Sequence, residues 1–120
     1  MKLYFGFAVS DSMFGNVTIV RQTMSPEDAG FLLETTSREI VSCCNSSHVP
    51  TIEALRTRYP DIAIRVNIPE KPPLVKLVPG DALMVMSVRG LPRLEGRHEY
   101  TSEEITNASF EFSIWHVLDY

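Results

Sequence analysis

The sequence predicts a small α+β domain in which a mixed β-sheet of about five to six strands carries two main helices. Composition supports this class, because 120 residues with 44% hydrophobic and 22% charged side chains can bury one core but not two. The order of residue types along the chain also supports this class, since short β-branched and aromatic runs alternate with two segments that begin with helix-start residues. We therefore expect residues 1–120 to form a single domain.

The amino-terminal third is expected to hold two strands and the first helix. Lys2 to Val9 is aromatic and aliphatic, and turn-forming residues separate it from the β-branched run Val17 to Arg21. We expect these two runs to pair as a hairpin. Ser25 and Pro26 then mark a helix start, because serine can cap the first amide groups and proline is tolerated at the first helical position.

The rest of the chain is expected to alternate between strands and short helices. A third strand is expected from Glu39 to Cys44, and a second helix from Val49 to Tyr59, where Pro60 ends it. Further strands are expected at 63–68, 74–78, 82–88 and 108–117, with a turn at 79–81, a surface loop at 89–100 and a brief helical turn from 101.

Charge and cysteine content exclude several classes of function. The net charge of -4 argues against duplex nucleic acid as a partner, although a small anionic ligand could still occupy a locally basic pocket. The apolar first nine residues are too short to span a membrane and lack a signal-peptide pattern, so no membrane association is expected. The neighbours Cys43 and Cys44 should point to opposite faces of a strand, which predicts neither a disulfide nor a metal site. They favour a reducing, cytoplasmic location, and no cofactor is expected.

Three polar clusters interrupt the apolar pattern where strands give way to loops, which is where rigid scaffolds usually carry function. They are Ser10 to Ser12, then Asn45 to His48 with Thr51, and finally Arg89 to His98. Ser10 and Ser12 could donate hydrogen bonds to a phosphate, but serines after a strand also commonly form turns.

His48 directly precedes the second expected helix. Backbone amide groups and the positive end of the helix dipole could receive a phosphate oxygen there. With a reference pKa of about 6.5, a histidine can also protonate a leaving alkoxide near neutral pH. The alternative interpretation is that His48 only caps or packs the helix start.

Arg89, Arg93 and Arg97 lie within nine positions, with Glu95 between them. Arginine side chains suit phosphate oxygens and stack on bases. Glu95 could orient a ribose hydroxyl or hold an arginine in place. The alternative interpretation is a solvated loop in which these charges pair with one another.

In their order along the chain, these clusters resemble the type III anti-CRISPR ring nucleases, small and mostly viral proteins that cleave cyclic tetra-adenylate. Residues 8–13 resemble the family's Ala-Phe-Ser-x-Asn-Met pattern, and residues 47–51 resemble its Gly-His-x-x-Thr motif at a helix start. Residues 93–96 resemble its Arg-Leu-(Pro/Glu)-Glu-Gly loop. The resemblance covers nearly the whole chain, and the succession of motifs carries it more than any single motif does.

The resemblance implies a homodimer that binds a cyclic oligonucleotide across its interface and cleaves it without a metal. In the family, a ribose 2′-hydroxyl attacks the neighbouring phosphate and a histidine protonates the departing 5′-oxygen, which leaves a 2′,3′-cyclic phosphate. The implied catalytic residues are His48 and Glu95, and the implied ligand-binding residues are Ser10, Ser12, Ser47, Thr51, Arg89 and Arg93.

Departures from the family pattern leave the ligand and the activity open. Phe7 stands in place of a polar asparagine, Ser47 in place of a glycine, and Ser87 in place of a glutamine. A different ring size or base is therefore compatible with the sequence. Three functions remain: a metal-independent ring nuclease, a non-catalytic cyclic-nucleotide sponge or sensor, and a viral protein-interaction module on the same fold.

Overall fold

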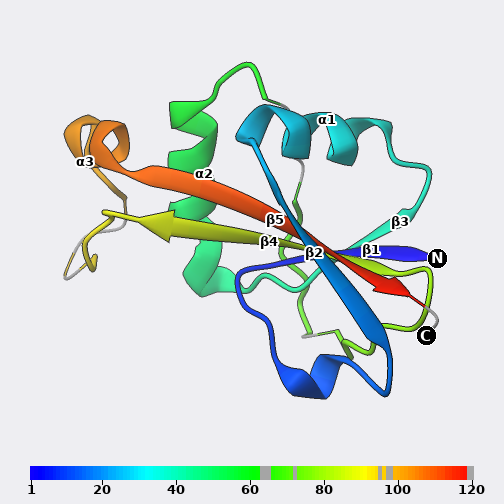
Figure 1. Ribbon diagram of the computed structural model, residues 1–120. Coiled ribbons are helices and arrows are strands. Elements are labelled where there is room, and N and C mark those ends of the chain that lie inside the picture. The colour runs from blue at the N-terminus through cyan, green and yellow to red at the C-terminus, as the bar shows by residue number, and fades with distance from the viewer. Residues whose placement is uncertain (63–65, 72, 95, 97–98, 119–120) are drawn as a thin grey trace.

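The computed structural model describes residues 1–62, 66–71, 73–94, 96 and 99–118, which form one small α+β domain around a mixed sheet (Figure 1). Within these residues the sheet has five strands in the order β2-β5-β4-β1-β3. The strands are β1 (Lys2–Gly6), β2 (Thr18–Met24), β3 (Glu39–Ser42), β4 (Ala82–Arg89) and β5 (Ser109–Leu118). The helices are α1 (Pro26–Thr35), α2 (Val49–Arg58) and α3 (Ser102–Asn107), with 3₁₀ turns η1 (Asp11–Met13) and η2 (Ser46–His48). The predicted fold class is confirmed.

Strands β1, β3 and β4 run parallel, whereas β5 is antiparallel to both of its neighbours, β4 and β2. Gly6 at the end of β1 pairs with Val85 of β4, and Phe5 pairs with Ser42 of β3. Parallel strands end at the same edge of a sheet, so the segments that follow β1, β3 and β4 all begin at that edge. The three polar clusters predicted from the sequence lie in these segments.

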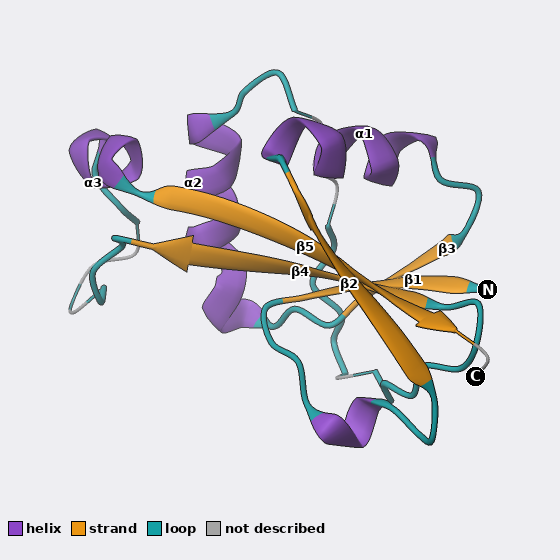
Figure 2. Ribbon diagram, viewed as in Figure 1, coloured by secondary structure: helices purple, strands orange, loops and turns teal. Residues whose placement is uncertain are grey.

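All three helices pack on one face of the sheet, and the main core lies between them and the strands (Figure 2). Alternate strand residues such as Leu3, Phe5 and Met84 are fully buried on this face, as the two-residue period of a strand requires. The helices contribute the buried side chains of Ala29, Leu33, Ile52, Ala54, Leu55 and Ile105. The relative positions of β1, β3 and α2 are therefore fixed by close packing.

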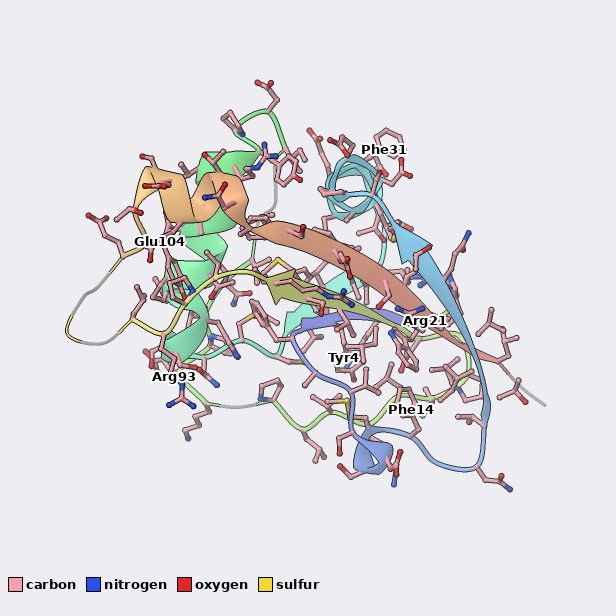
Figure 3. All side chains as sticks on the ribbon, turned by 60° about the vertical axis from the view of Figure 1, so that its left-hand side comes forward. Tyr4, Phe14, Arg21, Phe31, Arg93 and Glu104 are labelled. Carbon is pink, nitrogen blue, oxygen red and sulfur yellow. The ribbon has the colours of Figure 1, made fainter. Side chains whose placement is uncertain are left out.

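The opposite face of the sheet is covered only in part. Tyr4, Leu83 and Val117 form a second, smaller core there with residues 13–17 and Leu77 (Tyr4 and Phe14 are labelled in Figure 3). Towards the carboxyl ends of β2 and β4, this face carries polar side chains that are mostly exposed. The second face is thus half core and half open surface.

Two of the three helices begin with a side-chain cap. At α1, Pro26 occupies the first turn and the Ser25 hydroxyl accepts a hydrogen bond from the Asp28 amide at 3.1 Å. At α3, Thr101 and Glu104 form a reciprocal capping box. Helix α2 also begins with a proline, Pro50, but no side chain caps its amide groups. The three predicted helix starts are confirmed.

We expect Ser25→Ala to lower the free energy of unfolding by about 1 kcal/mol, because the Asp28 amide loses its acceptor at the N-terminus of α1. Urea denaturation would measure the change. Ser37→Ala, at an exposed position in the loop after α1, is the matched control and should change stability by less than about 0.5 kcal/mol. Equal effects of the two substitutions would contradict a capping role for Ser25.

The predicted hairpin between the first two strands is wrong. β2 pairs with β5 over its whole length and does not pair with β1. β1 is buried on both faces, with Leu3, Tyr4 and Phe5 all at 4% exposure or less, and it is an interior strand between β3 and β4. β2 is mostly exposed, which suits an edge strand.

The strand predicted at 74–78 is also wrong. Only Leu77 pairs there, through a single bridge to Phe14, and its amide donates to the Met13 carbonyl at 2.8 Å. Leu74 is 90% exposed, and the Val78 amide is taken by the Asp81 carboxylate. Of the strand predicted at 63–68, residues 66–68 are not a strand, and 63–65 lie outside the described residues.

Candidate functional site

The site predicted around His48 lies where the chain passes from β3 through η2 into α2, at the edge where the parallel strands end. The Asn45 side chain accepts a hydrogen bond from the Ser47 amide at 2.9 Å and another from the Ser47 hydroxyl. The Asn45 amide in turn donates to Nδ1 of His48 at 3.0 Å. These bonds form a capping box, so His48 does help to close the turn before α2.

Phe7 joins the end of β1 to this turn. Its ring stacks on the His48 imidazole, with 4.2 Å between ring centroids and 15° between ring planes. Phe7 also makes an edge contact with Phe5 in the main core, at 6.2 Å between centroids. The stack therefore anchors the imidazole to the end of β1. Desolvation by the surrounding protein lowers the pKa of His48 below its ordinary value of 6.5.

The bond from Asn45 fixes the tautomer of the imidazole. An amide N–H needs a lone pair on its acceptor, so Nδ1 carries no proton and the neutral ring carries its proton on Nε2. Within the described part of the chain, no side chain or carbonyl accepts a hydrogen bond from Nε2. His48 can therefore donate this N–H to an anionic oxygen of a ligand.

The start of α2 offers few free amide donors beside His48, because the Val49 amide donates to the Ser46 carbonyl and Pro50 has no N–H. The helix dipole still favours negative charge at this end. Thr51 lies in this first turn and is half-buried, whereas Ser47 is exposed. Both predicted residues therefore lie within three positions of His48.

Ser10 and Ser12 lie in the segment that follows β1. Their hydroxyl oxygens are 3.0 Å apart, and the Ser12 amide donates to Ser10 Oγ at 3.4 Å, where Ser10 caps η1. Both are exposed. The turn-forming role is confirmed, and among the described residues no hydrogen bond joins either serine to His48.

The predicted arginines divide between two places. Arg89 points to the partly open face of the sheet, where its guanidinium lies 3.8 Å from the Glu111 carboxylate. Phe7, which stacks on His48, packs instead with the core on the helix-covered face, so one chain does not bring Arg89 to His48. Arg93 is exposed in the loop that follows β4 (Figure 3). Glu95, Arg97 and His98 lie outside the described residues.

Sequence reasoning missed two features. It did not find Phe7 as the ring partner of His48, a contact that links the ends of two strands far apart in the sequence. It also missed a cavity of about 440 Å³ on the open half of the sheet. This cavity is lined by Arg21, Thr23, Met24, Ser87, Arg89, Phe110, Glu111, Phe112 and Ser113. The available signal was the polar run Arg21-Gln22-Thr23 at the end of the β-branched segment.

Two further searches of the structure gave no positive result. The described residues contain no group of three or more histidine, cysteine, aspartate or glutamate side chains that could hold a metal ion. Among the same residues, no helix has the length and apolar character needed to cross a membrane.

Comparison with known proteins gives a structural neighbour but no sequence family. No protein-family model and no curated protein sequence matches the chain. The structure is similar to that of B116 of Sulfolobus turreted icosahedral virus, with a TM-score of 0.67 and 20% sequence identity. The match covers 97% of this chain and 99% of that chain. The chain therefore has the fold of a small viral protein, and at this identity the likeness extends to the fold alone.

Proposed function

We propose that the protein binds a cyclic oligoadenylate resembling cyclic tetra-adenylate and cleaves it without a metal, thereby countering type III CRISPR defence. The observation that carries this proposal is the presentation of His48. Phe7 and the Asn45 amide hold its imidazole, Nε2–H is left for a ligand, and the start of α2 lies beside it. A phosphate placed there would meet a side-chain donor and the positive end of the helix dipole.

The proposed reaction is an in-line transfer within the ring. A ribose 2′-oxygen bonds to the neighbouring phosphorus as the bond from phosphorus to the 5′-oxygen breaks, and the product ends in a 2′,3′-cyclic phosphate. The departing 5′-oxygen takes a proton from the His48 imidazolium, while the attacking hydroxyl gives its proton to a solvent water molecule; the neutral imidazole then regains a proton from solvent. The family resemblance assigns Glu95, outside the described residues, to the orientation of that hydroxyl.

A homodimer is part of the proposal. A cyclic oligonucleotide repeats the same phosphodiester around its ring, so two copies of the chain could each offer one His48 to it. Ser10, Ser12, Ser47, Thr51 and Arg93 would contact the ring from the strand-end edge. Arg89 lies on the other face of the sheet from the His48 stack, so its contact with the ligand would require a second copy.

One observation favours the non-catalytic alternative, a sponge or sensor. His48 can protonate a leaving group only as an imidazolium, which requires a proton on Nδ1. That proton displaces the hydrogen bond from the Asn45 amide, so the present geometry suits a permanent donor better than a proton shuttle. Under this alternative the same pocket would bind the ring and leave it intact.

The test is to incubate the purified protein in EDTA with cyclic tri-, tetra- and hexa-adenylate and to identify the products by mass spectrometry. We expect linear products that end in a 2′,3′-cyclic phosphate. Recovery of an intact ring bound to the protein would support the sponge instead. If no ring binds and none is cleaved, the proposed nucleotide function is wrong and the protein-interaction module remains.

A further inference from the structure

The open half of the second sheet face carries a group of polar side chains, of which the proposed ring site would use only Arg89, and only through a second copy of the chain. Arg21 and Thr23 of β2, Ser113 of β5, and Ser87 and Arg89 of β4 line one cavity of about 440 Å³. A volume of this size is within the usual range for small-molecule sites. Two of its side chains are permanently positive, and three carry hydroxyl groups that can donate hydrogen bonds.

Arg21 is held by an aromatic neighbour. Its guanidinium carbon lies 5.7 Å from the centre of the Trp115 ring, in the range of a cation–π contact. The Trp115 indole N–H donates to Ser113 Oγ at 3.0 Å, which fixes the indole edge and leaves the Ser113 hydroxyl proton for another acceptor. Figure 3 shows Arg21 where β2 runs alongside β5. This end of the cavity is therefore preorganised.

Arg89 marks the other end of the cavity. Its only recorded ion pair among the described residues is with Glu111, at 3.8 Å, and the two side chains are 77% and 55% exposed. An exposed pair this long stabilises the fold by about 0 to 1 kcal/mol, so the guanidinium can turn to a stronger anionic partner at little cost.

The two arginines lie far apart along the sheet. Arg21 is at the level of Leu83 in β4, through the shared partner Trp115, and Arg89 lies six residues further along the same strand. At a rise of about 3.3 Å per residue, the backbone positions of the two arginines are roughly 20 Å apart. The two long side chains shorten the distance between the guanidinium groups but do not bring them together. The cavity is thus an elongated trough with a positive group at each end.

We propose that this trough binds an elongated ligand carrying phosphate groups at two points, which is the chemistry of a short linear oligonucleotide. One phosphate pairs with Arg21 and the other with Arg89. The hydroxyls of Thr23, Ser87 and Ser113 line the space between. Glu111 weakens the site, because its carboxylate competes for Arg89 and repels the nearby phosphate.

The trough is separate from the ring site. Arg21 stacks on Trp115, which packs with the smaller core on the second face, whereas His48 stacks on Phe7, which packs with the main core on the helix-covered face. The five-stranded sheet lies between them. Loss of His48 should therefore leave the trough intact, and loss of Arg21 should leave the ring site intact.

The experiment is to titrate the ¹⁵N-labelled full chain with three unlabelled probes and to follow binding by NMR. The probes are inorganic phosphate, adenosine 5′-monophosphate and 5′-phosphorylated diadenylate. We expect the diadenylate to bind at least about tenfold more tightly than the monophosphate, because only it reaches both arginines. Arg21→Met and Arg89→Met should each remove this advantage, whereas Glu111→Gln should strengthen diadenylate binding.

Arg56→Met is the matched control, because it removes one exposed arginine from α2 on the helix-covered face. It should leave diadenylate binding unchanged, and so should His48→Ala. Equal affinity for all three probes, or an equal loss with Arg56→Met and Arg21→Met, would overturn the two-point site and indicate general attraction to surface charge. Loss of diadenylate binding with His48→Ala would place that ligand in the ring site instead.

Discussion

Replacing His48 by alanine is expected to lower the rate of ring cleavage by a factor of about 100 to 10,000, because the departing 5′-oxygen loses its proton donor. Ring binding should persist, since the other proposed contact residues, Ser10, Ser12, Ser47, Thr51 and Arg93, remain. The rate is measured in single-turnover reactions with cyclic tetra-adenylate in EDTA, and binding is measured on the same samples by equilibrium dialysis.

His48→Gln separates proton transfer from packing. A glutamine amide has an oxygen that can accept from the Asn45 amide and an N–H₂ group that can donate to a phosphate, but it cannot act as an acid near neutral pH. We therefore expect binding close to that of the unmodified protein and cleavage as slow as in the alanine variant. Cleavage at the original rate in the glutamine variant would exclude His48 as the proton donor.

The pH dependence follows from the lowered pKa of His48. Burial of the ring disfavours the imidazolium, so in the free protein the acid form becomes the major form only at a pH below the ordinary pKa of 6.5. Cleavage should therefore become faster as pH falls from about 8 to about 6. The same shift means that the folded protein binds fewer protons than the unfolded chain between the lowered pKa and 6.5. Stability contributed by His48 thus increases with pH through that window.

Local patterns predicted most of the elements but not how they pair. Ser25, Pro26 and the Val49-Pro50 pair marked helix starts correctly, because caps and prolines act within a few residues of where they stand. The partner of β2 depended instead on which strand could be buried on both faces. That outcome is decided by the whole core, so adjacency in the sequence misled the prediction of a hairpin.

In the candidate site, too, local features were predictable from the sequence and long-range contacts were not. A structural role for His48 was predictable from its place before Pro50, but its side chain completes the capping box of η2 and does not cap α2. Its stacking on Phe7 required the parallel pairing of β1 with β3, which brings residues about forty positions apart into contact. The face on which Arg89 lies was set by the exact register of β4 against β5, and a shift of one residue would have reversed it.

Asp81 is a buried carboxylate, 5% exposed, in the turn that leads into β4. One oxygen accepts from the Lys2 amide at 2.9 Å and the other from the Val78 amide at 3.0 Å. The turn also places Gly80 at a φ of 95°, which a residue with a side chain adopts only with strain. Asp81 thus ties the start of β1 to the turn before β4.

We expect Asp81→Ala to lower the free energy of unfolding by about 2 to 4 kcal/mol, because two amide donors in a partly buried place lose a charged acceptor. Asp81→Asn keeps one oxygen acceptor and the side-chain volume, so its loss should be about half as large. Asp11→Ala, which removes an exposed carboxylate from η1, is the matched control and should cost less than about 0.5 kcal/mol. Urea denaturation of the three variants measures these differences. Equal stability of the Asp81 and Asp11 variants would show that the two hydrogen bonds of Asp81 do not stabilise the fold.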